Sequence, residues 1–111
     1  MEITAASKYV RISPSKVYAF ARLFKKGMPV SDALNLTRFS KKKAACLIEK
    51  TLKSAIANTE NNAKASADEF RIKSVIVEKG PSMKRYWHRA RGMVRPIIRR
   101  MCHIKVTLVN D

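Results

Sequence analysis

Residues 79–105 read KGPSMKRYWHRARGMVRPIIRRMCHIK, and the architecture of the chain can be inferred from this segment outward. Nine of its 27 residues are Lys or Arg, two are His and none is acidic. The flanking runs resemble strands: Phe70–Val77 is rich in β-branched residues, and His103–Val109 alternates between polar and apolar residues. Two strands joined by a long basic connector predict a β-hairpin whose far half leaves the body of the protein.

The length of the connector supports a protruding arm at about residues 79–103. From Val77 to a turn near Ala90 is 13 residues, which span about 40 Å at roughly 3.3 Å per residue. A compact chain of this size has a radius of gyration of only about 13 Å. The connector is basic on all sides and has few apolar residues, so we expect it to lie against a polyanion.

The whole chain is strongly basic. It has 111 residues, with 24 Lys and Arg against eight Asp and Glu, and a formal net charge of +16. Its apolar fraction of 46% is ordinary for a single folded domain over residues 1–111. This charge repels itself unless a polyanion neutralises it, and nucleic acid is the leading candidate. The sequence shows neither a membrane-spanning run nor a signal peptide, so we expect no membrane partner and a cytoplasmic location.

The N-terminal quarter predicts an edge strand followed by a helix. Residues 2–12 alternate weakly. The apolar side of this strand would comprise Ala6, Val10 and Ile12. Ser13 and Pro14 form a helix start, apolar residues follow at positions 17, 20, 21 and 24, and Gly27 is expected to end the helix.

Two further helices are expected. Ser31 would cap a short helix that ends near Phe39, and Ser40 would cap the longest helix, over residues 41–61. The apolar stripe of the longest helix is Ala45, Ile48, Leu52, Ala55, Ile56 and Thr59. Three lysines, 41–43, would then crowd its first turn, where the helix dipole disfavours cations. They form either a solvated cap or a phosphate site, and the phosphate site is favoured.

A loop of small residues, 61–68, joins the longest helix to the first hairpin strand. The resulting order is one strand, three helices, a second strand, the arm and a third strand. This order predicts an α+β fold, with three helices packed on a small three-stranded antiparallel sheet and a long protruding basic β-hairpin.

The chain offers little for catalysis or metal binding. Three glycines cannot build a phosphate-binding loop, and the acidic residues form no converging cluster. His88, within the arm, is better suited to a polar or stacking contact than to proton transfer. Cys46 and Cys102 are too few for a disulfide framework, and Cys102 with His103 lacks further metal ligands. We therefore expect no enzyme, no metal and no cofactor.

The arm carries residue types that bind nucleic acid. Tyr86 and Trp87 can stack on bases, although Trp87 could instead pack in a small core at the base of the arm. Arginines that can make bidentate phosphate contacts are Arg85, Arg89, Arg91, Arg95, Arg99 and Arg100. A two-stranded ribbon also suits the major groove of DNA, but such readers usually bind as dimers and no dimer interface is evident. Insertion of a monomer into folded RNA is therefore favoured over duplex DNA.

Several segments, in order and covering nearly the whole chain, carry a family signature. They are RISPSK at 11–16, KKAA at 42–45, SAIAN at 54–58 with Asn62, EKGPSMKR at 78–85, RARG at 89–92 and the strand that begins at His103. On these segments the chain resembles the bacterial-type large-subunit ribosomal protein twenty-two family.

The resemblance implies a non-enzymatic structural constituent of the large ribosomal subunit, monomeric within the ribosome. Such a protein binds large-subunit ribosomal RNA, supports assembly, touches neighbouring large-subunit proteins, and lines the polypeptide exit tunnel with its hairpin tip, next to the nascent polypeptide. The expected RNA-binding residues are Arg11, Ser13, Lys16, Lys41, Lys42, Lys43, Lys84, Arg85, Arg89, Arg91, Arg95, Arg99 and Arg100. The expected tunnel-lining tip comprises Tyr86, Trp87, His88, Arg89, Ala90, Arg91, Gly92 and Met93.

Some positions of this chain differ from the residues that are usual in the family it resembles. Trp87 and His88 are bulkier than the residues usual near the tip, and Met93 stands where a basic residue commonly follows the glycine. We expect Trp87 and His88 to narrow the tunnel relative to relatives.

Overall fold

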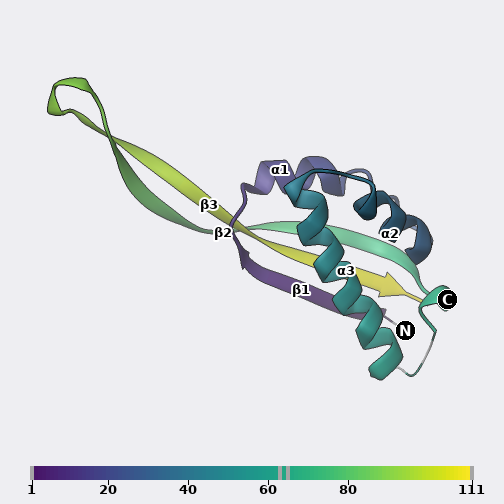
Figure 1. The fold of residues 1–111 in the computed structure, drawn as a ribbon. Helices are drawn as coiled ribbons and strands as arrows, with labels where there is room; N and C mark the ends of the chain where they lie inside the picture. Colours follow the sequence, from purple (N-terminus) through teal and green to yellow (C-terminus); the bar gives the residue numbers. More distant parts are fainter. Residues whose placement is uncertain (1, 63, 65, 111) are drawn as a thin grey trace.

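The computed structural model describes residues 2–62, 64 and 66–110, with Ala67 described by its backbone alone. Ala63 and Ala65 of the predicted loop lie outside the described residues. The elements are β1 (Glu2–Val10), α1 (Pro14–Ala21), α2 (Val30–Arg38), α3 (Lys43–Asn61), the short 3₁₀ turn η1 (Ala67–Glu69), β2 (Arg71–His88), the 3₁₀ turn η2 (Ala90–Gly92) and β3 (Val94–Val109). The strands form one antiparallel sheet in the order β1–β3–β2, and the helices cover one of its faces (Figure 1). The predicted α+β class is confirmed.

The C-terminal strand is the centre of the sheet. Ile104, Val106 and Leu108 alternate along β3 and are completely buried, as the sequence pattern predicted. Their cross-strand partners on the same face are Ile3, Ala5 and Ser7 of β1 and Ile72, Val75 and Val77 of β2. This face is the floor of the core, and the opposite face, with Lys105 and Ile76, is open to solvent.

The long helix α3 packs closely on this floor. Ala45 and Ala55 are completely buried with Ile48, so small side chains let the helix backbone approach β1 and β3. Thr51 turns its hydroxyl toward Ser7 of β1, and the two oxygens lie 2.6 Å apart in a hydrogen bond. The predicted stripe on α3 is confirmed, except that Ile56 is only partly buried.

The arm begins where β1 ends. The last β1–β3 pair is Val10 with Cys102, whereas β2 and β3 stay paired out to His88 and Val94. The molecule is consequently 62 Å long, with a radius of gyration of 17.0 Å, against about 13 Å for a compact chain of this length. Figure 1 shows a twisted two-stranded ribbon that projects from the body, so the predicted hairpin is confirmed.

A bulge marks the base of the ribbon. The register of β2 against β3 shifts between Lys79 and Ser82, and Gly80 lies directly against the opposite backbone. A Cβ atom placed on Gly80 would lie 3.2 Å from both the carbonyl carbon and the oxygen of Met101. Only glycine therefore fits this crossing without moving the backbone.

The start of α1 at Pro14, with Ser13 as N-cap, and the end of α2 near Phe39 are confirmed, but the end of α1 and the start of α2 were predicted wrongly. α1 ends at Ala21, not at Gly27, because Gly27 and Met28 exchange backbone hydrogen bonds with Ile72 at the start of β2, with N–O distances of 2.8 and 2.9 Å. Residues that make these strand-like hydrogen bonds cannot continue the helix. Pro29, which forms an isolated bridge to Arg71, caps α2 in place of Ser31.

The third helix also begins later than predicted. Its N-cap is Lys42, in extended conformation, and Lys43 is its first residue. The Ser40 hydroxyl accepts a hydrogen bond from the Lys42 backbone N–H at 3.3 Å, so it stabilises a bend before the helix and does not cap it. The prediction that all three lysines crowd the first turn is therefore wrong.

Of the three residues predicted on the inward face of β1 and the turn after it, Val10 and Ile12 pack against the core, but Ala6 was assigned wrongly. Ala5 is buried and Ala6 is exposed, because a register shift lies between Ser7 and Val10. Tyr9 occupies the left-handed region with φ of 59°, and its N–H donates to Nδ1 of His103 at 3.0 Å. The register shift adds one residue to β1 and so returns the Val10 side chain to the inner face. The alternation of residue types in the sequence does not indicate such a shift.

Within the described residues, no helix has the length and apolar character needed to cross a membrane.

We expect Ile104→Ala to lower the free energy of unfolding by about 2–5 kcal/mol, because it leaves a cavity in the centre of the core. Ile76→Ala is the matched control: Ile76 lies on the open face and is 42% exposed, so its truncation should cost less than about 1 kcal/mol. Urea unfolding followed by circular dichroism measures both. Equal losses would contradict the assignment of the two faces.

Candidate nucleic-acid interface

A basic groove lies at the root of the arm, where the body and the ribbon meet. It has a volume of about 580 Å³. The residues that line it come from the β1–α1 connection, from α1 and α3, and from both arm strands: Arg11, Ile12, Ser13, Lys16, Lys43, Met83, Ile98, Arg99, Arg100 and Met101. Residues as far apart in the chain as Arg11 and Met101 therefore line one surface.

Five side chains in this groove are cationic and, among its described lining residues, none is acidic. The Lys43 ammonium donates to the backbone oxygen of Arg11 at 3.3 Å, which ties the start of α3 to the β1–α1 connection. The ion pairs in the described part of the chain, Lys53 with Glu49 and Lys73 with Glu2, lie outside the groove. Among the described residues, no carboxylate neutralises the cations of the groove, so their charge is available to an external anion.

Both faces of the ribbon beyond the groove are basic. Opposite residues of an antiparallel pair share a face, so the register places Lys84 with Ile98 on one face. On the other face, Arg85 pairs with Ile97 and Trp87 with Arg95. Neither face is uniformly apolar, so neither can pack on a protein core, and the ribbon exposes cations in both directions.

The tip is a short turn closed by backbone hydrogen bonds. The Arg89 N–H donates to the Met93 carbonyl at 2.6 Å. Arg91 and Gly92 both have positive φ, of 62° and 71°. Left-handed conformation is ordinary for glycine and uncommon for arginine, so the turn relies on Gly92 and holds Arg91 in a sparsely populated region.

Large side chains near the tip are exposed. Tyr86, Trp87 and Met93 retain 66%, 57% and 60% of their accessible surface. Trp87 lies at the far end of the ribbon, opposite Arg95, so a small core around it at the base of the arm is excluded. The aromatic pair is available to a partner of the tip.

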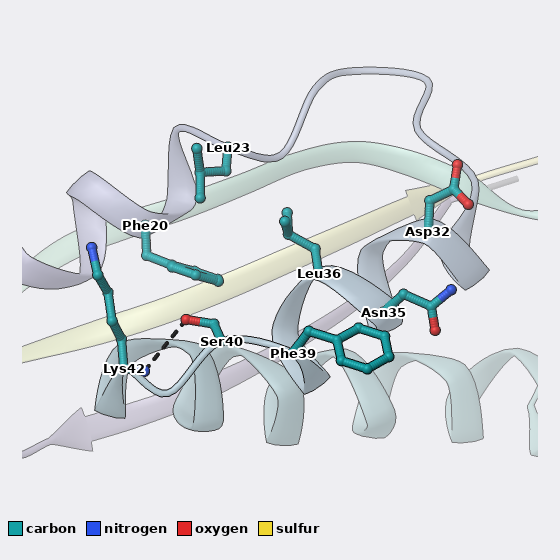
Figure 2. A pocket seen from close by; sticks show the side chains of 8 residues that line it. All are labelled: Phe20, Leu23, Asp32, Asn35, Leu36, Phe39, Ser40 and Lys42. Atoms are coloured by element: carbon teal, nitrogen blue, oxygen red, sulfur yellow. Dashed lines mark hydrogen bonds between the residues drawn. The ribbon is translucent and has the colours of Figure 1, made fainter.

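The structure divides the predicted RNA-binding residues into three locations. The groove collects Arg11, Ser13, Lys16, Lys43, Arg99 and Arg100. The ribbon and its tip carry Lys84, Arg85, Arg89, Arg91 and Arg95. Lys41 and Lys42 precede α3, and Lys42 lines a different hollow, next to α2 (Figure 2).

Sequence reasoning missed this second hollow. It has a volume of about 540 Å³ and lies between the end of α1 and the α2–α3 connection. Phe39 was treated only as a helix end, yet 82% of it is exposed. The available signal was a phenylalanine directly before four polar and basic residues, Ser40 to Lys43, where no core position was expected.

One family model and two related proteins match the chain over most of its length. The model of the family described as ribosomal protein L22p/L17e matches residues 5–109. The chain is 47% identical over 108 residues to the large ribosomal subunit protein uL22 of Pseudothermotoga lettingae, a match covering 97% of this chain and 77% of that protein. It is 46% identical over 111 residues to uL22 of Akkermansia muciniphila, covering 100% and 98% of the two chains. The chain belongs to the ribosomal protein L22p/L17e family.

Membership of the L22p/L17e family confirms the resemblance drawn from the sequence motifs. Proteins of this family are structural and not enzymes, so the prediction that the chain is not an enzyme is also confirmed.

The cysteines have surroundings of different kinds. Cys46 is exposed on α3, whereas Cys102 is completely buried and its burial raises the pKa of its thiol. His103, beside it in sequence, accepts a hydrogen bond from Tyr9. In the described residues, no three His, Cys, Asp or Glu side chains come close enough to hold a metal ion.

The groove gives a prediction for RNA binding by this L22p/L17e protein. The logarithm of the RNA association constant falls linearly with the logarithm of the salt concentration. Arg100→Gln should make this slope less steep by about 0.7–0.9, the contribution of one phosphate contact. Filter binding of the full chain to large-subunit ribosomal RNA, at several salt concentrations, measures the slope. Lys50→Gln is the control, since Lys50 is exposed on α3 outside the groove. Equal slopes for Arg100→Gln and the unaltered chain would show that no phosphate contacts Arg100.

Proposed function

We propose that this chain binds large-subunit ribosomal RNA through its basic groove and arm, supports assembly of the subunit, and lines the polypeptide exit tunnel with its tip. As a member of the L22p/L17e family it is a structural constituent of the large ribosomal subunit, located in the cytoplasm. It therefore associates with ribosomal RNA and with other ribosomal proteins. The proposal concerns the surfaces and the residues through which it does so.

The observation that supports the proposal most directly is the two-sided charge of the ribbon. Among the described residues, the Val94–Arg100 part of β3 pairs with β2 alone, and this ribbon carries arginines on one face and Lys84 with Arg100 on the other. Isolated two-stranded hairpins are marginally stable in water. Ribosomal RNA on both faces would supply the missing contacts and neutralise the charge.

A protein whose arm is surrounded by RNA can also support assembly of the subunit. The groove cations would hold RNA at the body, and the ribbon would hold RNA further along the 62 Å length of the molecule. Segments that are distant in the RNA sequence would thereby be fixed relative to one another. The proposed RNA contacts are Arg11, Ser13, Lys16, Lys41, Lys42, Lys43, Lys84, Arg85, Arg89, Arg91, Arg95, Arg99 and Arg100.

The tip is proposed to lie in the tunnel wall, next to the nascent polypeptide. Its residues are Tyr86, Trp87, His88, Arg89, Ala90, Arg91, Gly92 and Met93. The exposed Trp87 and the neighbouring His88 would narrow the passage, because both are large and project from the end of the ribbon.

Sedimentation through a high-salt sucrose gradient tests the RNA-bound arm. Contacts made only by surface charges weaken steeply with salt, whereas an arm enclosed by folded RNA is also held sterically. We expect the chain to sediment with the large subunit at high salt. Release to the top of the gradient would contradict an enclosed arm and favour a peripheral binder or a regulator of duplex DNA.

Photo-crosslinking tests the position of the tip. A photoreactive amino acid at position 87, in ribosomes stalled with a radiolabelled nascent chain, should form an adduct with that chain. The same amino acid at position 50, on α3, is the control and should form none. An adduct from position 87 to RNA alone would place Trp87 inside the wall and contradict the narrowing of the tunnel.

A further inference from the structure

The second hollow has an apolar centre that the fold leaves open. Leu23 is 50% exposed and Phe39 82% exposed, while Phe20 and Leu36 line the space between them. Figure 2 shows Phe20, Leu36 and Phe39 arranged around this space, between α1 and α2. Exposed apolar side chains grouped in a concave surface are typical of a binding site.

The two ends of the hollow differ in charge. Lys42 lies at one end, and Asp32, with Asn35 beside it, lies toward the other (Figure 2). Lys42 is the only cationic residue among the described residues that line this hollow, and its neighbour Lys43 lines the basic groove. An acidic peptide would meet repulsion at Asp32 and a basic peptide would meet it at Lys42. The matching ligand carries an anion at one end and hydrogen-bond donors at the other.

A single unstacked nucleotide has this polarity. Its phosphate is an anion, its base is a flat aromatic ring whose faces stack on aromatic side chains, and the Watson–Crick edge of guanine, adenine or cytosine presents N–H donors. Aromatic side chains bind such bases by stacking, and amide or carboxylate side chains bind their edges.

We propose that this hollow binds one splayed-out nucleotide of the large-subunit ribosomal RNA. The base stacks on Phe39, its amino edge faces Asp32 and Asn35, and its phosphate lies at Lys42. This inference depends on the proposed function, since it requires that the chain bind ribosomal RNA. It adds base recognition to a surface otherwise explained by phosphate contacts alone.

Photo-crosslinking within assembled large subunits tests the occupant. A benzoylphenylalanine at position 39 should form an adduct with one nucleotide of the ribosomal RNA, identified by nuclease digestion and mass spectrometry. The control places it at Tyr18, which is 59% exposed on α1 and does not line the hollow. An adduct from position 39 to a neighbouring protein, adducts to scattered nucleotides, or no adduct would each overturn the proposal.

Binding of purified variants to large-subunit ribosomal RNA separates stacking from charge. Phe39→Ala and Phe39→Leu should both weaken binding about 5- to 150-fold at fixed salt, with the salt slope unchanged. Phe39→Trp should retain binding, and Lys42→Gln should reduce the slope by about 0.7–0.9. Full binding by Phe39→Leu would show that no base stacks there.

The two proposals fail in distinguishable ways. If the variants at position 39 sediment with the large subunit and yet give no RNA adduct, the nucleotide site is wrong and the RNA-bound arm stands. If the unaltered chain is released in high salt, the enclosed arm is wrong. Since Phe39 is mostly exposed, its variants should fold normally, which an unchanged thermal midpoint verifies.

Discussion

The pairing of β3 with β2 beyond the end of β1 is the constraint on which the molecule depends. From Cys102 to Val109, β3 is the central strand of a sheet with helices on one face. From Val94 to Arg100, the same ladder with β2 continues away from the core. Because β2 and β3 are continuous strands, the part of the ladder that is fixed in the body anchors the part that projects as the arm. The glycine at position 80 permits the close backbone contact at the junction.

The distribution of charge follows from this division. In the body, apolar residues occupy the helix-facing side of the sheet and cations remain on the surface. In the arm, the absence of a core leaves both faces free to carry arginine, lysine and aromatic residues. The groove forms at the boundary, because the start of α3, the β1–α1 connection and the arm strands converge there. This chain thereby carries cations in the groove, along the ribbon and at the tip.

Local exceptions to regular structure occur where tertiary contacts compete with sequence preference. Gly27 and Met28 leave the first helix in order to bond to Ile72, and Tyr9 takes a left-handed conformation that directs its N–H to His103. Ser40 bonds to a bend in place of capping α3, which leaves Lys42 beside the apolar hollow. The positions of α1, α2 and the hollow between them depend on these contacts.

Residue patterns were sufficient to predict the α+β class, the alternation of Ile104, Val106 and Leu108, the basic arm and the family, because each depends on local periodicity, charge or motif. The tertiary structure alone decided which distant cations share the groove and which side of β1 faces the core. It also decided where the first and third helices stop and start, and that Phe39 borders a hollow. These features depend on hydrogen bonds and packing between segments far apart in the chain. Local residue patterns carry no information about such contacts.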